Sequence, residues 1–481
     1  MRPGKTTLID FASNLVVSVA GFVATFLIAV LLGPAALGDY AVATALGFFW
    51  LAVPGNAVGT AVTKRMSEGV DPRVYLTTGL AINVLVGAML AFFVVAIGAV
   101  LPSIVATEGS TFLTAVVIYA EPIGILVFGT YVYSAVSSGL EGQKRVATAG
   151  GLKAVERVGR TLLQVAAILL GYGVSALIFG HALALLLTAL LGLYLAGMRP
   201  SLPEREHVDR LIEFAKYAWM GALRGRVFGW MDTVVLALFV SSTLIGIYEA
   251  AWGIASLMAA VSASIQRTLF PELSDLSTDA AYDRVKHLLD EGLVFAGVFV
   301  IPGLAGAAVI GTRVLEFYRP AFTQGAGILV ILVLAYWFDV YASQFVSVIN
   351  AVDAPDVAFR VNYAFIGANM ILNVGLIWQF GWYGAAVATA VSSALRMGLG
   401  FVALRNIVGR LSVPTREIGL EVVAAVAMAA AVLVAKPAAP AGRLGTLLLV
   451  GFGAGLYVVL LLVLSTRIRE KAVSFVPVDP L

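Results

Sequence analysis

Cysteine is absent from the 481 residues of this chain. Disulfides, thiolate nucleophiles and cysteine-ligated metals are therefore excluded. Histidine is almost as rare, with three residues. His207 and His287 lie in polar loops, and His181 lies inside an apolar segment, where a hydrogen-bonded packing role is expected. Because these histidines form no ligand cluster, the sequence predicts neither a metal site nor a cofactor.

Charge is scarce as well. Charged side chains make up 12% of the chain, against about 25% in an average soluble domain. The formal net charge of +3 is too small to indicate nucleic-acid binding. Hydrophobic residues account for 60% of the sequence, and the mean hydropathy is +0.96. Their runs reach the roughly 20 residues needed to cross a bilayer. The sequence therefore predicts an all-α polytopic membrane protein.

Fourteen apolar segments are candidate transmembrane helices, and the longest of them must tilt or kink. They cover residues 8–32, 37–63, 74–101, 111–138, 154–172, 174–197, 213–239, 243–268, 288–311, 323–349, 358–380, 383–405, 415–435 and 443–466. With the N-terminus inside, 24 of the 31 Lys and Arg fall at the inner termini, inner loops and adjoining helix ends, and four fall outside. An excess of basic residues marks the cytoplasmic side. We expect a multi-pass plasma-membrane protein with both termini in the cytoplasm.

Two pairs of similar motifs indicate an internal duplication. The motif LGDYA at 37–41 matches IGIYEA at 245–250, 208 positions later, and GYGVSA at 171–176 matches GWYGAA at 381–386, 210 positions later. Two landmarks with nearly the same offset predict a repeated six-helix unit. Duplicated membrane units are typical of transporters, in which two lobes expose one cavity to each side in turn.

The repeat divides the chain into four parts. Residues 1–198 form a predicted N-lobe of six helices, 199–212 a cytoplasmic linker, and 213–405 a C-lobe of six helices. Residues 406–481 add two helices without a counterpart and a cytoplasmic tail.

Charged side chains inside the apolar segments are the candidate site residues, because each costs about 2.5–3.5 kcal/mol at the bilayer centre unless it faces a partner or a wet cavity. The seventh segment carries Arg224 and Arg226 roughly 17–20 Å along its axis, near mid-membrane. Arginine suits an anionic substrate, since its planar fork binds phosphate and stays charged when desolvated. The alternative is that either arginine simply pairs with Asp232 or Glu249.

Further candidates follow the same logic. Arg396 in the twelfth segment could contact a substrate or pair with Asp339. The intramembrane acids could balance the arginines or bind H⁺ or Na⁺ in coupled transport; they are Glu121, Asp232, Glu249 and Asp339, with Asp39 at the end of the second segment.

The polar and helix-breaking residues add three expectations. Asn14 and Asn56 could line a cavity that accepts sugars. Pro122 predicts a kink beside Glu121, and residues 54–56, Pro-Gly-Asn, predict a bend in the second segment. No acidic pair lies in an outer loop and no nucleophile–base pair stands out, so we predict a protein that is not an enzyme.

The order and spacing of several motifs resemble those of prokaryotic polysaccharide exporters. The motifs are LGPAALGDY at 32–40, NAVDAPD at 350–356, Asn369, Asn373 and GWYGAAVAT at 381–389. They are similar to the O-antigen and lipid-linked oligosaccharide flippases of the multidrug/oligosaccharidyl-lipid/polysaccharide superfamily. The resemblance covers residues 5 to 405, and the last two segments suit its fourteen-helix members.

The resemblance implies two six-helix lobes around a cavity lined mainly by the first, second, seventh and eighth helices. It implies that a glycan on a polyprenyl or dolichyl phosphate moves from the inner to the outer leaflet, with membrane lipids and the glycosyltransferases of the pathway as partners. On this mapping Arg224 or Arg226 lies at the cavity, whereas Arg396 lies outside the lining helices.

Three alternatives remain at this stage. A cation-coupled multidrug exporter would use the same architecture. The lipid II flippases of the superfamily usually carry more cavity arginines near the amino terminus, where this chain has only Arg2. A membrane-embedded glycan polymerase would need a large outer loop with catalytic residues, and the longest outer loops here have only about ten residues.

Overall fold

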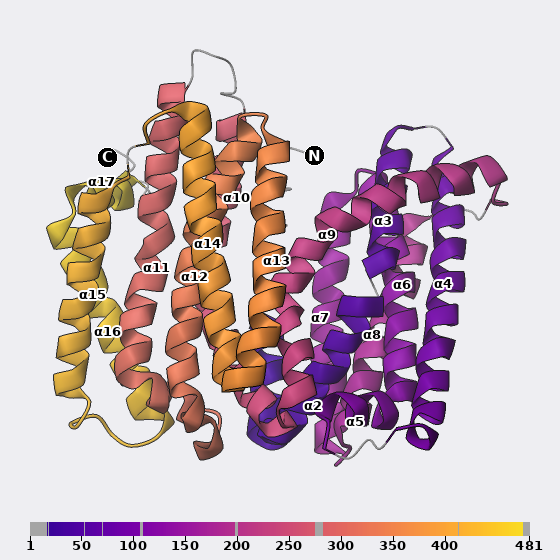
Figure 1. The fold of residues 1–481 in the computed structure, drawn as a ribbon, viewed down its shortest axis with the longest axis horizontal. Helices are drawn as coiled ribbons and strands as arrows, with labels where there is room; N and C mark the ends of the chain where they lie inside the picture. Colours follow the sequence, from indigo (N-terminus) through magenta and orange to yellow (C-terminus); the bar gives the residue numbers. More distant parts are fainter. Residues whose placement is uncertain are drawn as a thin grey trace, which may run out of the picture. The chain divides into compact units, whose positions relative to one another are not determined.

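The computed structural model describes residues 17, 19–51, 53–69, 71–105, 109–197, 201–274, 282–411 and 413–474 (Figure 1). Within them it does not describe the side chains of 49–54, 217, 219–227, 259–284 and 471–474. The described residues are almost entirely helical and include no strand, which confirms the all-α fold class. Nine of the described helices are long and apolar enough to cross a membrane.

The helices follow the apolar segments of the sequence. In chain order they are Val19–Leu31, α2 (Pro34–Ala45), the π-helix η1 (Leu46–Leu51), α3 (Val53–Ser67), α4 (Pro72–Val100), the 3₁₀ turn η2 (Leu101–Ser103), α5 (Thr111–Ile118), α6 (Ala120–Gly142), α7 (Val146–Leu169), α8 (Val174–Ala196), α9 (Arg205–Phe239), α10 (Ser242–Ser274), α11 (Tyr282–Glu316), η3 (Pro320–Gly325), α12 (Ala326–Ala351), α13 (Pro355–Phe380), α14 (Trp382–Val408), α15 (Thr415–Ala435), α16 (Arg443–Leu464) and α17 (Thr466–Ser474). Every predicted segment contains helix, while the count of fourteen crossings stays a prediction.

The second apolar segment is interrupted, as the sequence predicted. The helix α2 passes into the π-helix η1, and α3 follows it. A proline at 54 has no backbone N–H, so the carbonyl four residues earlier loses its helical partner. A π-turn is one way to absorb such a defect, and π-turns occur frequently at functional sites.

The predicted kink beside Glu121 is also present. The helix α5 ends at Ile118 and α6 begins at Ala120, and Tyr119 between them has φ −107° and ψ 16°, outside the helical range. Pro122 therefore lies in the first turn of α6, where its missing N–H costs nothing.

The helix α9 begins eight residues before the segment predicted from 213. The early turns carry an Arg210–Glu206 ion pair with N···O 2.5 Å, four residues apart, a spacing that supports a helix. Leu211 is fully buried in an apolar cluster with residues of α3, α4, α6, α7 and α8. Part of the expected linker 199–212 is therefore helical, with Leu211 packed against the bundle and charged residues on the outer side of the helix.

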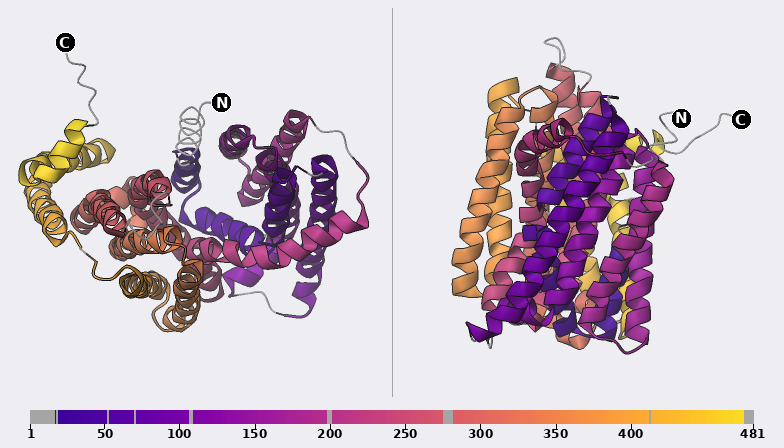
Figure 2. Two further views of the ribbon diagram at one scale, coloured as in Figure 1. Left: turned by 90° about the horizontal axis from the view of Figure 1, so that it is seen from above. Right: turned by 90° about the vertical axis from the view of Figure 1, so that its right-hand side faces the viewer.

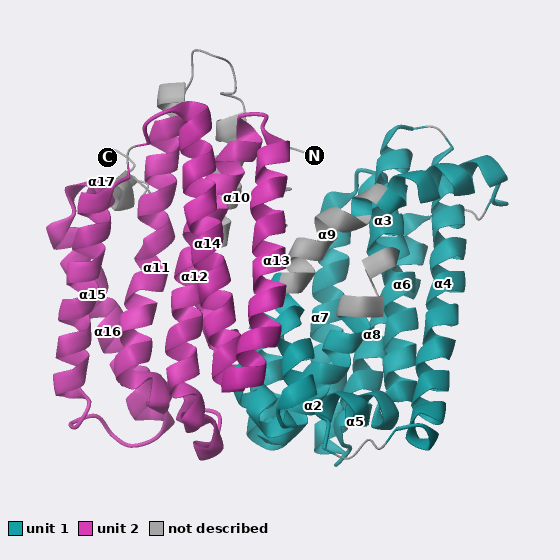
Figure 3. Ribbon diagram, in the orientation of Figure 1, with its two compact units in different colours: residues 1–249 teal, residues 250–481 magenta. Residues whose placement is uncertain are grey.

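The chain forms two compact units, Met1–Glu249 and Ala250–Leu481 (Figure 3). In the first unit α6 packs against α3, α4 and α8. In the second, α12 and α14 pack together, and α11 contacts α15 and α16 around an apolar cluster. The helices of each unit stand side by side as a bundle when seen along their axes (Figure 2). The contacts group α9 with the first unit, whereas the lobe boundaries drawn from the repeat stay a prediction.

The paired motifs that indicated a duplication touch each other inside the first unit. A Cβ added to Gly38 of α2 would collide with the carbonyl oxygen of Ser242, and one added to Gly246 of α10 would collide with that of Pro34. Each carbonyl belongs to the residue four positions before the opposite glycine, so the contact is reciprocal. The side chain of Asp39 accepts a hydrogen bond from Ser242 at the same crossing.

Candidate functional site

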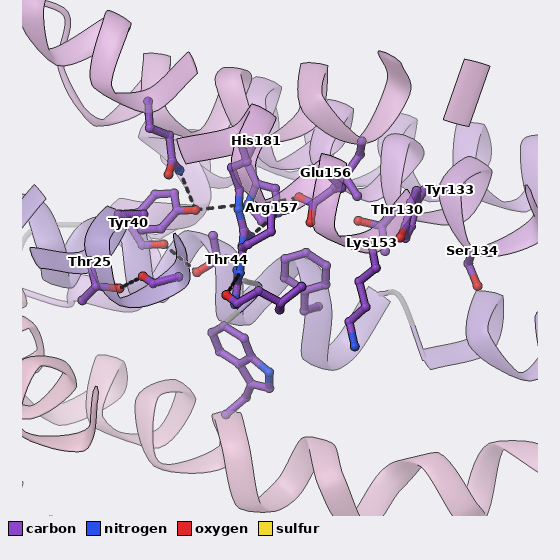
Figure 4. Close-up of a pocket in the computed structure, with 18 of the residues that line it drawn as sticks. Thr25, Tyr40, Thr44, Thr130, Tyr133, Ser134, Lys153, Glu156, Arg157 and His181 are labelled. Carbon is purple, nitrogen blue, oxygen red and sulfur yellow. Dashed lines mark hydrogen bonds and ion pairs between the residues drawn. The ribbon is translucent and has the colours of Figure 1, made fainter. Parts of the chain in front are cut away.

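A polar cavity of about 790 Å³ lies in the first unit (Figure 4). Its lining comes from the first described helix, α2, η1, α3, α6, α7 and α8, with Trp230 of α9 and Glu249 of α10. The aromatic ring of Phe48 in η1 lies between the rings of His181 and Trp230, with centroid distances of 5.3 and 6.0 Å. The π-turn thus places the ring of Phe48 in a cavity that is otherwise lined largely by polar side chains.

One face of α7 supplies most of the charged side chains of the cavity, and Glu141 of α6 and Glu249 of α10 supply the others. Lys153, Glu156, Arg157, Arg160 and Gln164 all line it. Their spacings of three and four residues keep them on one side of a helix with 3.6 residues per turn. Arg157 is eleven residues from the start of α7, or roughly 16 Å along the axis, so the charged face reaches deep into the helix bundle.

Arg160 is held by a buried network. Its guanidinium lies 3.6 Å from Glu156, and its Nη1 lies 2.8 Å from Nε2 of His181. Because a guanidinium can only donate hydrogen bonds, Nε2 must accept one. The proton of a neutral His181 therefore sits on Nδ1, which lies 3.1 Å from the Tyr40 hydroxyl. This geometry assigns Arg160 to the protein itself rather than to a ligand.

The Tyr40 hydroxyl forms the other end of this network. It accepts a hydrogen bond from Gln164 Nε2 at 2.8 Å and faces the Nδ1 atom of His181. His181 is buried, as expected for a hydrogen-bonded packing residue, and it also lines the cavity. The network fixes α2, α7 and α8 in relation to one another, so it gives the cavity a rigid wall.

Arg157 and Lys153 differ from Arg160 in forming no close ion pair, although Glu141 and Glu156 line the same cavity and act electrostatically on Lys153. Among the residues that the structure describes, no carboxylate oxygen lies within 4.0 Å of either cation. Arg157 Nε donates to the carbonyl oxygen of Val17 at 3.2 Å, and the guanidinium lies over Gly21, where an added Cβ would come within 2.9 Å of it. Two cations at one wall of a polar hollow are suited to binding an anion.

The remaining walls are rich in hydroxyl and amide groups. Those of α6 and α3 are Thr130, Tyr133, Ser134, Ser137, Ser138, Asn56 and Thr60. The hydroxyl of Ser134 donates to Oδ1 of Asn56 at 3.2 Å. Groups of this kind can donate and accept hydrogen bonds, as the hydroxyls of a sugar require.

Two predicted site residues line the cavity, Asn56 and Glu249. Glu249 accepts a hydrogen bond from Thr233. Asp232 and Asp39 belong to the same unit without lining the cavity; Asp232 accepts from Tyr248, and Asp39 accepts from Tyr119 at 3.1 Å. Glu121 is exposed in the first turn of α6.

Arg396 and Asp339 lie in the second unit and pair with each other, as the charge-balance alternative expects. Arg396 is completely buried and also donates to Asn362 and Ser343, each at 3.1 Å. Arg224 and Arg226 lie on α9, but their side chains fall outside those that the structure describes, and Asn14 lies outside the described residues altogether.

Sequence reasoning missed the charged face of α7. Lys153, Arg157 and Arg160 stand at the start of the predicted segment 154–172, so they were counted with the basic inner loop. The helix begins at Val146, eight residues earlier. The signal that could have found the face is the spacing of its polar residues, which repeats with the period of a helix.

The apolar helices and the polar cavity define a multi-pass membrane protein of the transporter class. Residues 4–277 match the family described as "Polysaccharide biosynthesis protein". The "Probable flippase AglR" of Haloferax volcanii is 32% identical over 97% of this chain and 97% of its own length. The chain belongs to this polysaccharide biosynthesis family, as its motifs predicted.

A second relative and two solved structures agree with this assignment. The "Probable low-salt glycan biosynthesis flippase Agl15" of Haloferax volcanii is 25% identical, covering 73% of this chain and 75% of its own. The inward closed "Lipid II flippase MurJ" covers 97% of this chain and 100% of its own, with TM-score 0.80 and 14% identity. An inward-facing multidrug resistance MATE family transporter of the MOP superfamily covers 83% and 98%, with TM-score 0.69 and 11% identity. At these identities the two structures show a shared fold and no more.

Proposed function

We propose that this protein is a flippase that moves a lipid-linked oligosaccharide from the inner to the outer leaflet. The observation that carries the proposal is the cavity of the first unit, where the cations Arg157 and Lys153 share the lining with the hydroxyl and amide groups of α3 and α6. Glu141 and Glu156 also line it, but among the described residues no carboxylate oxygen lies within 4.0 Å of either cation. Both Haloferax relatives carry the name of a probable flippase, and one of them that of a glycan biosynthesis flippase, which supports the proposal.

The phosphate of the substrate is assigned to Arg157 and Lys153. An arginine fork binds two phosphate oxygens at once, and a lysine adds a compact charge. Arg157 is partly buried, so its charge-assisted hydrogen bonds are stronger than in water, whereas Lys153 is exposed at the same cavity. Arg224 and Arg226 of α9 remain proposed partners of the same phosphate.

The glycan is assigned to the hydroxyl and amide groups of α6 and α3. Ser134 and Asn56, already hydrogen-bonded to each other, can exchange that bond for sugar hydroxyls at small cost. We expect alternating access between leaflets, both termini in the cytoplasm, and the glycosyltransferases of the pathway as partners. Glu249, which lines the cavity, is the proposed site for H⁺ or Na⁺ coupling.

The test is transport of a fluorescent oligosaccharide on polyprenyl phosphate in proteoliposomes. Substitutions Arg157→Ala and Lys153→Ala each remove a charge-assisted hydrogen bond worth about 1.5–3 kcal/mol. We therefore expect the initial flipping rate at low substrate to fall at least about tenfold in each. Arg360→Ala, on the exposed part of α13, is the matched control and should leave the rate unchanged.

Two further arms sharpen this test. Arg224→Ala and Arg226→Ala measure the contribution of α9 in the same assay. The phosphate assignment fails if all four substitutions leave glycan flipping intact. The flippase proposal fails if the wild type moves no glycan above protein-free liposomes while it exports cationic dyes. That result would favour the cation-coupled multidrug exporter.

A further inference from the structure

A buried carboxylic acid in the second unit has no role in the cavity described above. Glu421 lies in the second turn of α15, and its exposed fraction is 0%. Neither of its carboxyl oxygens has a hydrogen-bond partner among the residues that the structure describes. Its helix, α15, packs with α11 and α16 around an apolar cluster that includes Val294, Ile301 and Ala425.

Two buried tyrosines of separate helices lie within electrostatic range of this acid. The hydroxyls of Tyr341 on α12 and Tyr457 on α16 have no hydrogen-bond partner among the described residues. On α11, Gly297 leaves the space for them, because a Cβ there would collide with Glu421 Oε2 and come within 2.7 Å of the Tyr341 hydroxyl. Four helices thus converge on one carboxyl group.

An ionised carboxylate at this position would be an unpaired buried charge, which is strongly unfavourable. The neutral acid removes that cost, because its O–H can donate and its carbonyl oxygen can accept hydrogen bonds from the tyrosine hydroxyls after a small movement or through a water molecule.

The basic residues at the ends of α15, α16 and α17 do not supply a counter-ion. Arg467 binds Asp290 with N···O 2.6 Å. Lys436 Nζ donates to the carbonyl oxygen of Val309 at 2.8 Å, and Arg443 Nε donates to that of Phe317 at 3.1 Å. Each of these cations is therefore engaged away from Glu421.

A metal cation fits this site less well than a proton does. The indole of Trp337 lies beside Tyr341, with a centroid distance of 6.1 Å, and an indole N–H can only donate. The backbone carbonyls of the surrounding helices accept helical hydrogen bonds. The candidate oxygen ligands are therefore one carboxyl group and two phenol hydroxyls. Hard divalent cations such as Ca²⁺ and Mg²⁺ need about six or more oxygen ligands.

We propose that Glu421 is a proton-binding site, which gains and loses a proton through Glu417. Glu417 lies one turn earlier on the same face of α15, is half-buried, and acts electrostatically on Glu421. The proton bonds to one carboxyl oxygen of Glu421 and leaves to water through Glu417, with no other group changed. This inference does not depend on the proposed transport function.

The helices around Glu421 carry other titratable and charged groups. Those that the structure describes on α11, α12 and α15 to α17 are Lys286, His287, Asp290, Glu291, Arg313, Glu316, Tyr336, Asp339, Tyr341, Arg416, Glu417, Lys436, Arg443, Tyr457, Arg467, Arg469 and Glu470.

Infrared difference spectroscopy of the full chain in lipid nanodiscs tests the proposal. We expect a carboxylic C=O band that disappears as pH is raised and is lost in Glu421→Gln at every pH. Tyr341→Phe and Tyr457→Phe should keep the band and shift its frequency, because they change the hydrogen bonding of the acid. Glu417→Gln should keep the band and slow its disappearance after a pH jump.

Substitution of glycines on α11 supplies matched variants in case Glu421→Gln does not fold. Gly297→Ala places a methyl group against the acid and should shift the band. Gly306→Ala, on the same helix with nothing within 4 Å of its added Cβ, should leave the band unchanged.

A band that survives in Glu421→Gln, or one that Gly297→Ala and Gly306→Ala leave equally unchanged, overturns the proposal. So does the absence of any band at low pH. If NaCl, compared with choline chloride, then raises the melting temperature of the wild type and not of Glu421→Gln, the site binds sodium instead.

Discussion

At the scale of single residues, buried and exposed arginines in this protein have different roles. Arg396 has no exposed surface and pairs with Asp339, whose side chain is 16% exposed. Arg360 pairs with Asp356 on the surface, where the two side chains are 78% and 65% exposed. An Arg–Asp pair is therefore expected to contribute strongly to stability when it is buried and very little when it is exposed.

Replacement of Arg396 by alanine should destabilise the protein strongly. Asp339, whose side chain is only 16% exposed, would lose the charge that balances it, and breaking such a largely buried pair costs about 3–5 kcal/mol. Arg360→Ala should change the free energy of unfolding by about 0–1 kcal/mol, because water screens its pair. SDS-induced unfolding in mixed micelles measures both. Equal stability of the two variants would contradict a structural role for Arg396.

The contact between Gly21 and Arg157 allows the phosphate site to be disturbed without loss of charge. In Gly21→Ala the new methyl group would displace the guanidinium, a flexible group that can move aside. We expect flipping to fall severalfold while the thermal stability is retained. Gly159→Ala on α7, where an added Cβ meets nothing within 4 Å, is the control. Unchanged flipping in Gly21→Ala would place the phosphate elsewhere.

At the scale of helices, the crossing of α2 and α10 is the tightest constraint described above. Gly38→Ala and Gly246→Ala each force a methyl group against a backbone carbonyl, which cannot rotate away as a side chain can. Overpacking of this kind costs about 1–3 kcal/mol or more. We expect both variants to have lowered melting temperatures.

Gly253→Ala serves as the control for that prediction, since it lies on α10 with nothing within 4 Å of its added Cβ. A methyl group there should leave stability unchanged or raise it slightly, because alanine favours helix over glycine by about 1 kcal/mol. If all three variants have the same melting temperature, the close crossing does not hold α2 against α10.

Helices were predictable from the sequence because apolar length and proline are local signals. The break before residue 54 and the kink at Tyr119 followed from proline alone. The charged face of α7 did not follow, because a cation near the end of an apolar segment reads equally as an interfacial residue or as part of a cavity. Only the packing of α6, α7 and α8 decides between the two.

The side-chain pairs show the same division. The Arg396–Asp339 pair could be named from the sequence, because two rare intramembrane charges of opposite sign need partners. The network of Arg160, His181 and Tyr40 joins three helices and depends on their rotation about their own axes. A sequence pattern specifies which face of a helix is polar, but it does not specify what that face meets.

For the whole molecule, the absence of cysteine makes the proposed orientation directly testable. Single cysteines can be introduced at exposed positions without removing any native thiol. With both termini in the cytoplasm, Lys144→Cys should be cytoplasmic and Ser241→Cys external. A membrane-impermeant maleimide applied to intact cells should label only the second, and lysis should expose the first. The reverse pattern would invert the proposed topology.

The reciprocal contact of Gly38 and Gly246 has a consequence for the history of this chain. A contact in which each partner presents the same surface to the other is the mark of a twofold-symmetric homodimer. If a single six-helix chain once paired with its twin, one glycine met its own copy across the axis. After gene duplication and fusion that single position became two, Gly38 and Gly246, and each can now be substituted separately. Variants at these two sites can therefore measure how far the halves have become independent.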